Sequence, residues 1–232
     1  MAKNLEDIIE IANPQQPHVA TVLLIDTSGS MAGNIPQLKE GLAQFKEDVL
    51  KDDLARKRVD LAVISFNSDV QVIHDFSPIE DFDVPELMAM NSTKMGTGIL
   101  KAIELIENRK KDYKTKNISF YRPWIFMITD GEPTDMQEGD DLWNTVIKAI
   151  HEGETNNKFL FFIVGVDNAN MRILDKISPK NRKPIHMKDG HFNEMFLWLS
   201  RSQQKVSCSR VGEQVILENP VSEHGWGEIS TN

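Results

Sequence analysis

Residues 22–31 read Val-Leu-Leu-Ile-Asp-Thr-Ser-Gly-Ser-Met, and this stretch decides both the fold class and the place of the functional site. Four apolar residues end at Asp26, and hydroxyl side chains follow at Ser28 and Ser30. A continuous apolar run is typical of a buried parallel strand. Oxygen atoms gathered where such a strand ends are the ligands that hard divalent cations prefer. Because Asp, Ser and Gly are also ordinary turn and cap residues, the stretch alone leaves a simple turn open.

A second apolar run ends in the same way. Residues 124–131 read Trp-Ile-Phe-Met-Ile-Thr-Asp-Gly, so Asp130 follows the apolar residues. Thr97 lies in the stretch Lys-Met-Gly-Thr-Gly-Ile, just before a helical pattern. In a doubly wound sheet, ligands bind beyond the carboxyl ends of the strands, at the switch point. If the strands that end near Asp26 and Asp130 are neighbours in the sheet, the two carboxylates meet there.

The chain alternates strand-like and helix-like segments, which predicts right-handed crossovers and a doubly wound sheet. We expect an α/β fold, a Rossmann-like three-layer sandwich with helices on both faces of a six-stranded, mostly parallel sheet. One edge strand is expected to be antiparallel. Predicted strands cover residues 18–26, 58–66, 70–76, 123–129, 159–166 and 185–187, and predicted helices cover residues 35–50, 85–89, 98–111, 140–156, 168–177 and 192–206.

The spacing of these polar residues resembles the metal-ion-dependent adhesion site (MIDAS) of von Willebrand factor type A (VWA) domains, over about residues 18–205. The resemblance implies one divalent cation with an open coordination position. Mg²⁺ is favoured, with Mn²⁺ or Ca²⁺ as alternatives, because a site with few carboxylates suits a small, partly hydrated ion. The ligands implied, some of them through water, are Asp26, Ser28, Ser30, Thr97 and Asp130.

Within the family, the run Leu-Leu-Ile-Asp-Thr-Ser-Gly-Ser-Met is similar to the TerY-like group of bacterial cytosolic VWA proteins. The resemblance implies a metal-dependent adaptor or scaffold that binds an acidic residue of a partner protein. It also implies a kinase and a phosphatase as partners, in stress or tellurite-resistance signalling. The residues expected to form a partner-binding rim are Met31, Asn34, Met95, Glu132, Pro133 and Thr134.

Motifs for other chemistries do not match this sequence. The glycine pattern of a dinucleotide fold and the Walker phosphate loop are both missing from it. Haloacid-dehalogenase-type phosphatases, which also end a strand in Asp, have a second Asp two positions later, where this chain has Ser28. No nucleophile is paired with a base, so we do not expect an enzyme. The alternative that stays open is a metal-dependent phosphohydrolase or enzyme subunit that uses Asp26.

Composition sets the remaining expectations. A net charge of −9 argues against nucleic acid as a partner. No apolar run is long enough to predict a membrane span. The single cysteine, Cys208, cannot form an internal disulfide, which favours a reducing cytoplasm. We expect an N-terminal helical extension over residues 1–17, the main domain over residues 18–206 and a tail over residues 207–232, with residues 215–217 as a candidate added strand.

Overall fold

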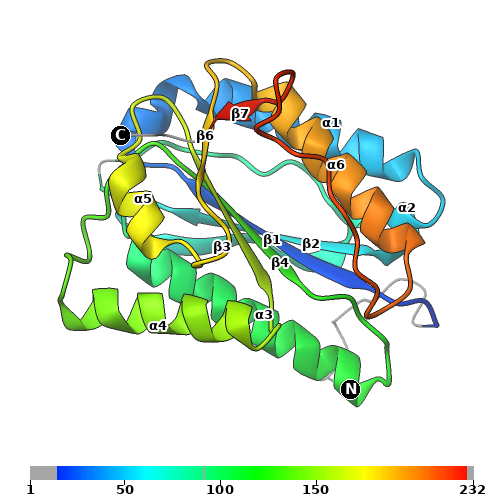
Figure 1. The fold of residues 1–232 in the computed structure, drawn as a ribbon. Coiled ribbons are helices and arrows are strands. Elements are labelled where there is room, and N and C mark those ends of the chain that lie inside the picture. Colours follow the sequence, from blue (N-terminus) through cyan, green and yellow to red (C-terminus); the bar gives the residue numbers. More distant parts are fainter. Residues whose placement is uncertain (1–14, 91, 229–232) are drawn as a thin grey trace, which may run out of the picture.

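The structure, a computed structural model, describes residues 15–90 and 92–228. These residues form one twisted sheet between two layers of helices (Figure 1). The strands are β1 (Val19–Asp26), β2 (Val59–Phe66), β3 (Val70–Pro78), β4 (Trp124–Thr129), β5 (Leu160–Gly165), β6 (Ile185–Met187) and β7 (Gly227–Glu228). The helices are α1 (Ile35–Leu50), α2 (Ala55–Arg58), α3 (Met95–Thr115), α4 (Asp141–Thr155), α5 (Met171–Ile177) and α6 (Phe192–Cys208), with short 3₁₀ helices η2 (Gly29–Gly33) and η3 (Ile79–Asp81).

The strand order is β3-β2-β1-β4-β5-β6-β7. The five inner strands run parallel, and β3 and β7 are antiparallel at the two edges. The predicted fold class is therefore confirmed. The sheet has one strand more than predicted in the described chain, because Gly227 of β7 pairs with Met187 of β6.

The central strand β1 shows why this sequence forms a three-layer fold. All eight of its residues are buried, and successive side chains point to opposite faces of the sheet. Leu23 and Ile25 pack with α1 and α6 on one face, while Val22 and Leu24 pack with α3, α4 and α5 on the other. Both faces of β1 are apolar and covered by helices. The polar residue at its end, Asp26, is therefore the candidate for a functional role.

The α1–α6 pair on the first face is packed very closely. A Cβ atom built on Gly41 of α1 would lie 2.1 Å from the ring of Phe196 in α6. No larger residue fits at position 41 unless that ring moves. Figure 1 shows α1 and α6 lying over the same face of the sheet.

Three local predictions differ from the structure. Residues 85–89 form no helix and run as an irregular segment toward the end of β1. Helix α3 begins at Met95 and not at residue 98, so Gly96 and Gly98 lie inside the helix. Residues 215–217 form no strand, and the added strand is β7.

The two ends of the chain were predicted to be an N-terminal helical extension and a C-terminal tail. Residues 1–14 of the expected N-terminal extension lie outside the described residues. The tail packs on the domain, because Trp226 is buried and contacts Trp198 of α6 edge-on, with ring centroids 5.8 Å apart. No helix in the described part of the chain is both long and apolar enough to cross a membrane.

Candidate metal centre

The two strand-end aspartates lie at the same edge of the sheet. Asp26 is the last residue of β1, and Asp130 directly follows β4. The strands are parallel neighbours, with Ile25 opposite Ile128. The sequence analysis required the strands that end near Asp26 and Asp130 to be neighbours, and β1 and β4 are neighbours in the structure.

Asp26 is fully buried and held by hydrogen bonds on both oxygens. The amide of Ser28 donates to Oδ1 at 2.8 Å, and the hydroxyl of Thr129 donates to Oδ2 at 2.5 Å. Burial raises the pKa of Asp26 to about 6, although these hydrogen bonds act to lower it, and the nearby Asp130 raises it further. A buried carboxylate with no cation beside it favours its protonated form.

A chain of hydroxyl groups connects the first loop to Asp130. The Ser28 and Ser30 hydroxyls lie 3.1 Å apart, and the Ser30 hydroxyl donates to Asp130 Oδ1 at 2.9 Å. Burial raises the pKa of Asp130 as well, and the charge of Asp167 adds to the shift. The structure thus brings together four of the five predicted ligands: Asp26, Ser28, Ser30 and Asp130.

The fifth predicted ligand, Thr97, is engaged elsewhere. It lies in the first turn of α3, and its hydroxyl donates to Asp135 Oδ2 at 2.8 Å. Thr93 precedes the helix and is buried. A Cβ atom built on Gly131 would lie 3.5 Å from Thr93 Oγ1 and 3.7 Å from Asp26 Oδ2, so both oxygens border the same small space.

Thr93 borders the candidate site and was not among the residues predicted from the sequence. The helix was predicted to begin at residue 98, which made Thr97 the last loop hydroxyl. With the helix starting at Met95, the loop hydroxyl is Thr93. The available signal was the second threonine four residues earlier, in Ser-Thr-Lys-Met-Gly-Thr.

Two residues clamp the Thr93 loop to the loop that carries Asp130. Thr134 exchanges two hydrogen bonds with Thr93: its hydroxyl accepts from the Thr93 amide at 3.0 Å, and its amide donates to the Thr93 carbonyl at 2.9 Å. The Asp135 carboxylate accepts from the Gly96 amide at 3.1 Å and the Thr97 amide at 2.9 Å. We call Thr134 and Asp135 the loop clamp, because they join the two loops into one unit.

The predicted rim divides into buried and exposed residues. Met31 and Met95 have no exposed surface and are core side chains, so their placement on the rim was wrong. Asn34 is also buried, and its amide donates to Asp167 Oδ2 at 2.6 Å. The predicted rim residues that are open to solvent, fully or in part, are Glu132, Pro133 and Thr134.

Two exposed methionines that were not predicted lie in the segment that reaches the first loop. Met88 and Met90 are 72% and 51% exposed, in the irregular segment before α3. The Met90 amide donates to the Thr27 carbonyl at 2.8 Å, which holds this segment against the first loop. The metal centre therefore has an apolar flank on one side.

The donor set fits a hard divalent cation. The oxygen atoms gathered at this edge belong to two carboxylates and to the hydroxyls between them. The described residues contain no group of three or more His, Cys, Asp or Glu side chains that could hold a metal ion. Two carboxylate charges balance one divalent ion, and all donors are oxygens. The raised pKa of Asp26 also fits a cation site, since a bound cation would offset the unfavourable burial of the carboxylate charge.

The sheet order and the strand-end oxygens define a doubly wound α/β domain with an oxygen-donor site at its switch point. Residues 21–196 match the model of the von Willebrand factor type A domain, and the chain belongs to this family. Members of this family mediate protein–protein interactions, often through a divalent cation at the MIDAS motif.

Solved structures share the fold at low sequence identity. A von Willebrand factor type A protein from Catenulispora acidiphila has a TM-score of 0.57 and 16% identity, over 82% of this chain and 43% of its own. Proximal thread matrix protein 1 from mussel byssus, with a zinc-occupied MIDAS motif, has a TM-score of 0.54 and 16% identity, over 83% and 48%. The pilus adhesin SpaC from Lactobacillus rhamnosus GG has a TM-score of 0.61 and 12% identity, over 82% and 30%.

This chain spans less than half of each of these neighbours. A search of the curated proteins gives no match.

Proposed function

We propose that this chain is a metal-dependent protein-binding module. Its oxygen-donor site would hold one divalent cation, Mg²⁺ in the first place and Mn²⁺ or Ca²⁺ as alternatives. The bound cation would supply an electrophilic centre for an Asp or Glu side chain of a partner protein. The residues proposed to hold the cation are Asp26, Ser28, Ser30, Thr93 and Asp130.

One observation carries this proposal: the hydrogen-bonded path from Asp26 through Ser28 and Ser30 to Asp130. It joins two carboxylates, both with raised pKa, through the Ser28 amide and two neutral hydroxyls, without any protein cation in the path. The mussel protein with zinc in its MIDAS motif supports the same reading for a chain of similar fold. Thr97 is proposed to act on the loop through Asp135 and not as a ligand.

The surroundings of the site suggest how a partner would be selected. The chain carries a net charge of −9, so long-range attraction does not favour an acidic partner. Recognition would depend on the cation at short range and on the exposed residues beside it. Glu132, Pro133, Met88 and Met90 are the open side chains proposed to contact the partner.

The assignment to a group within the family depends on the sequence of residues 23–31 alone. That run supports a place in the TerY-like group, with a kinase and a phosphatase as partners in a bacterial, cytoplasmic stress-response or tellurite-resistance assembly. We further propose that the chain is not an enzyme. The phosphohydrolase alternative needs Asp26 as a nucleophile, yet both of its carboxylate oxygens accept hydrogen bonds and the side chain has no exposed surface.

Calorimetric titration of Mg²⁺ and Mn²⁺ into metal-free protein tests the proposal. Wild type should bind one equivalent, and Asp26→Ala and Asp130→Ala should bind none. Asp81→Asn is the matched control, since it removes one exposed carboxylate in η3, away from the site. Equal binding by wild type and Asp26→Ala would show that the motif is only a turn.

A second measurement separates binding from catalysis. Wild-type protein with Mg²⁺ should show no turnover of model phosphate esters. Turnover that is lost in Asp26→Ala would instead establish the phosphohydrolase.

A further inference from the structure

A second concave site lies at the other end of the sheet from Asp26. A cavity of about 770 Å³ opens at the start of β4 and β5, where Trp124 and Leu160 are the first strand residues. Its walls come from the end of α3, the loop after α4 and the segment 209–217 that follows α6. This volume lies in the range of ligand-binding pockets in proteins, roughly 300–1,000 Å³.

The charge of this cavity is opposite to that of the whole protein. Four cationic side chains line it against one acidic side chain, Glu213, in a chain of net charge −9. The four cationic residues are Lys110, Lys114, Arg122 and Lys158. A hollow lined mainly by cationic side chains attracts anionic groups at short range, even on a protein of net negative charge.

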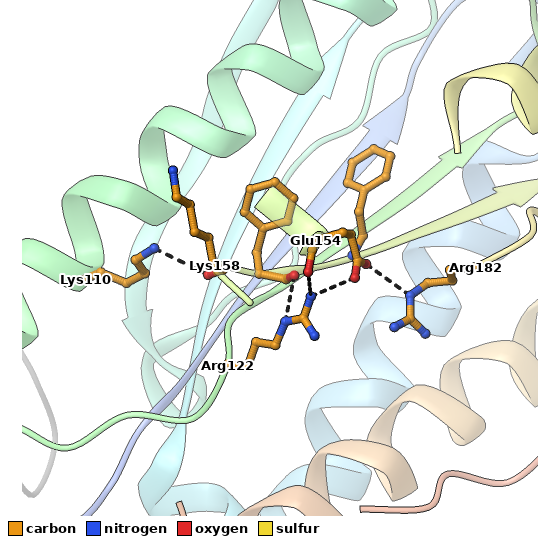
Figure 2. A network of polar contacts seen from close by, with 7 residues as sticks. Lys110, Arg122, Glu154, Lys158 and Arg182 are labelled. Carbon is orange, nitrogen blue, oxygen red and sulfur yellow. Dashed lines mark hydrogen bonds and ion pairs between the residues drawn. The ribbon is translucent and has the colours of Figure 1, made fainter. Parts of the chain in front are cut away.

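Two of the four cationic groups are fixed by the protein itself. Arg122 donates to the Phe159 carbonyl at 2.8 Å and to Glu154 Oε2 at 2.7 Å. Lys110 pairs with Glu107 at 2.6 Å and reaches the Lys158 carbonyl at 3.4 Å. Figure 2 shows Glu154 between Arg122 and Arg182, so the acidic partner of Arg122 is itself shared.

The other two cationic groups are open to a ligand. Lys114 and Lys158 are exposed, and within the described residues the structure shows no ion pair for either. They stand on different elements, the last turns of α3 and the loop before β5, yet both line the cavity. Both are therefore available to anionic groups of a ligand.

Another part of the lining is apolar. Val206 at the end of α6 and Val211, Val215 and Leu217 of the following segment line it, and Val211 is 47% exposed. A ligand that fits both walls has an anionic edge and an apolar edge. Inorganic phosphate would meet only the lysines and leave the apolar wall in water.

We propose that this cavity binds an acidic and apolar segment of a partner protein. Glu or Asp side chains of the segment contact Lys114 and Lys158, and its apolar side chains pack on Val211, Val215 and Leu217. A protein segment is the occupant because it carries both kinds of side chain in alternation, and because this family acts through protein–protein contacts. The contact needs no metal ion.

The test uses a fluorescein-labelled nine-residue peptide of alternating glutamate and leucine, with anisotropy as the readout and a chelator present throughout. Wild type should bind it saturably, and more weakly as salt rises. The double variant Lys114→Glu/Lys158→Glu should lose about tenfold or more in affinity, since two attractions become repulsions. Lys57→Glu/Lys180→Glu is the matched control, because it makes the same charge change on exposed residues that do not line the cavity.

Further arms test the apolar wall. Val211→Ser should weaken binding several-fold, and a peptide of alternating glutamate and serine should bind more weakly than the leucine peptide. Circular dichroism melting curves check that each variant folds as wild type does. No binding by wild type, equal losses in both double variants, or displacement by millimolar phosphate alone would overturn the proposal. Binding that appears only with Mg²⁺ would overturn it too, because the peptide would then occupy the metal centre.

Discussion

Two buried aspartates, one in each of two adjacent strands, differ in what surrounds them. Asp26 ends β1 and Asp60 is the second residue of β2, and neither is more than 1% exposed. Burial raises the pKa of Asp26 to about 6. Burial acts on Asp60 in the same direction, but a hydrogen bond from His18 and the charge of Arg109 outweigh it, and the pKa of Asp60 lies below its usual range.

The difference lies in the partners that the protein provides. Arg109 donates to Asp60 Oδ2 at 2.7 Å and Tyr113 donates to the same oxygen at 2.5 Å, so Asp60 has a cation built into the core. The donors to Asp26 are neutral groups of Ser28 and Thr129, and its charged neighbour is another acid. A buried carboxylate with its own cation is structural, whereas one without a cation is suited to a cation from solution.

The largest effect should follow from removing the built-in cation. Arg109→Met leaves the Asp60 charge buried and without its cation, which should lower the free energy of unfolding by about 3–5 kcal/mol. Urea unfolding measures this, and the double variant Arg109→Met/Asp60→Asn should recover part of the loss. If Arg109→Met costs less than about 1 kcal/mol, Asp60 does not depend on its cation and the comparison fails.

The next effect concerns pH in the metal-free protein. Because the pKa of Asp26 is raised from 3.8 to about 6, its contribution to stability is fully present below pH 3.8 and is lost as pH rises through about 6. A shift of this size corresponds to roughly 3 kcal/mol. Asp26→Asn should therefore be more stable than metal-free wild type at pH 7 and similar to it near pH 3.5, by urea unfolding.

The cation itself provides the control for that prediction. Saturating Mg²⁺ should stabilise wild type at pH 7, by about 2.7 kcal/mol at a hundred times the dissociation constant, and should leave Asp26→Asn unchanged. Stability of Asp26→Asn below that of metal-free wild type at pH 7 would show that the charge of Asp26 already has a partner within the protein.

A smaller effect on Mg²⁺ affinity should distinguish Thr93, before α3, from Thr97, within its first turn. Thr93→Val should weaken Mg²⁺ binding about tenfold, as expected for the loss of one oxygen ligand of about 1.4 kcal/mol. Thr97→Val should weaken it only a few-fold, because Asp135 keeps its bonds to the Gly96 and Thr97 amides. Calorimetry that ranks Thr97→Val as the more damaging change would restore Thr97 as the ligand.

The smallest effect on the domain itself should come from the apolar flank. The double variant Met88→Ser/Met90→Ser changes exposed side chains and should move the free energy of unfolding by no more than about 0.5 kcal/mol. Mg²⁺ affinity by calorimetry should also stay at the wild-type value. A clear loss of either would mean that the segment supports the first loop through its side chains and not only through the Met90 amide.

The sequence predicted the features that depend on hydrophobic periodicity and on the residues at the strand ends. The apolar runs before Asp26 and Asp130 gave the two central strands, and their polar ends gave the site at the switch point. The start of α3 was misplaced because Gly96 and Gly98 are poor helix residues, while Asp135 and the packing of Met95 hold that turn in place. The predicted start at residue 98 left Thr97 in the loop, whereas the structure leaves Thr93 there.

Other features have no local signal. Asp60 and Arg109 are 49 residues apart, and nothing near either one indicates that they meet. The cationic cavity gathers Lys114, Lys158 and Val211 from three separate elements. Residues 85–89 have a composition compatible with a short helix, but they form an irregular segment that ends where Met90 forms a bridge with Ser28. Such features depend on tertiary contacts and appear only in the folded chain.

Helix α3 runs from the candidate metal centre at its first turn to the cationic cavity at its last turns. Its first turn is tied through Asp135 to the Asp130 loop, and its last turns carry Lys110 and Lys114. At 1.5 Å per residue, its 21 residues span about 31 Å as one stiff rod. A displacement of α3 along its axis would therefore move both of its ends by the same distance.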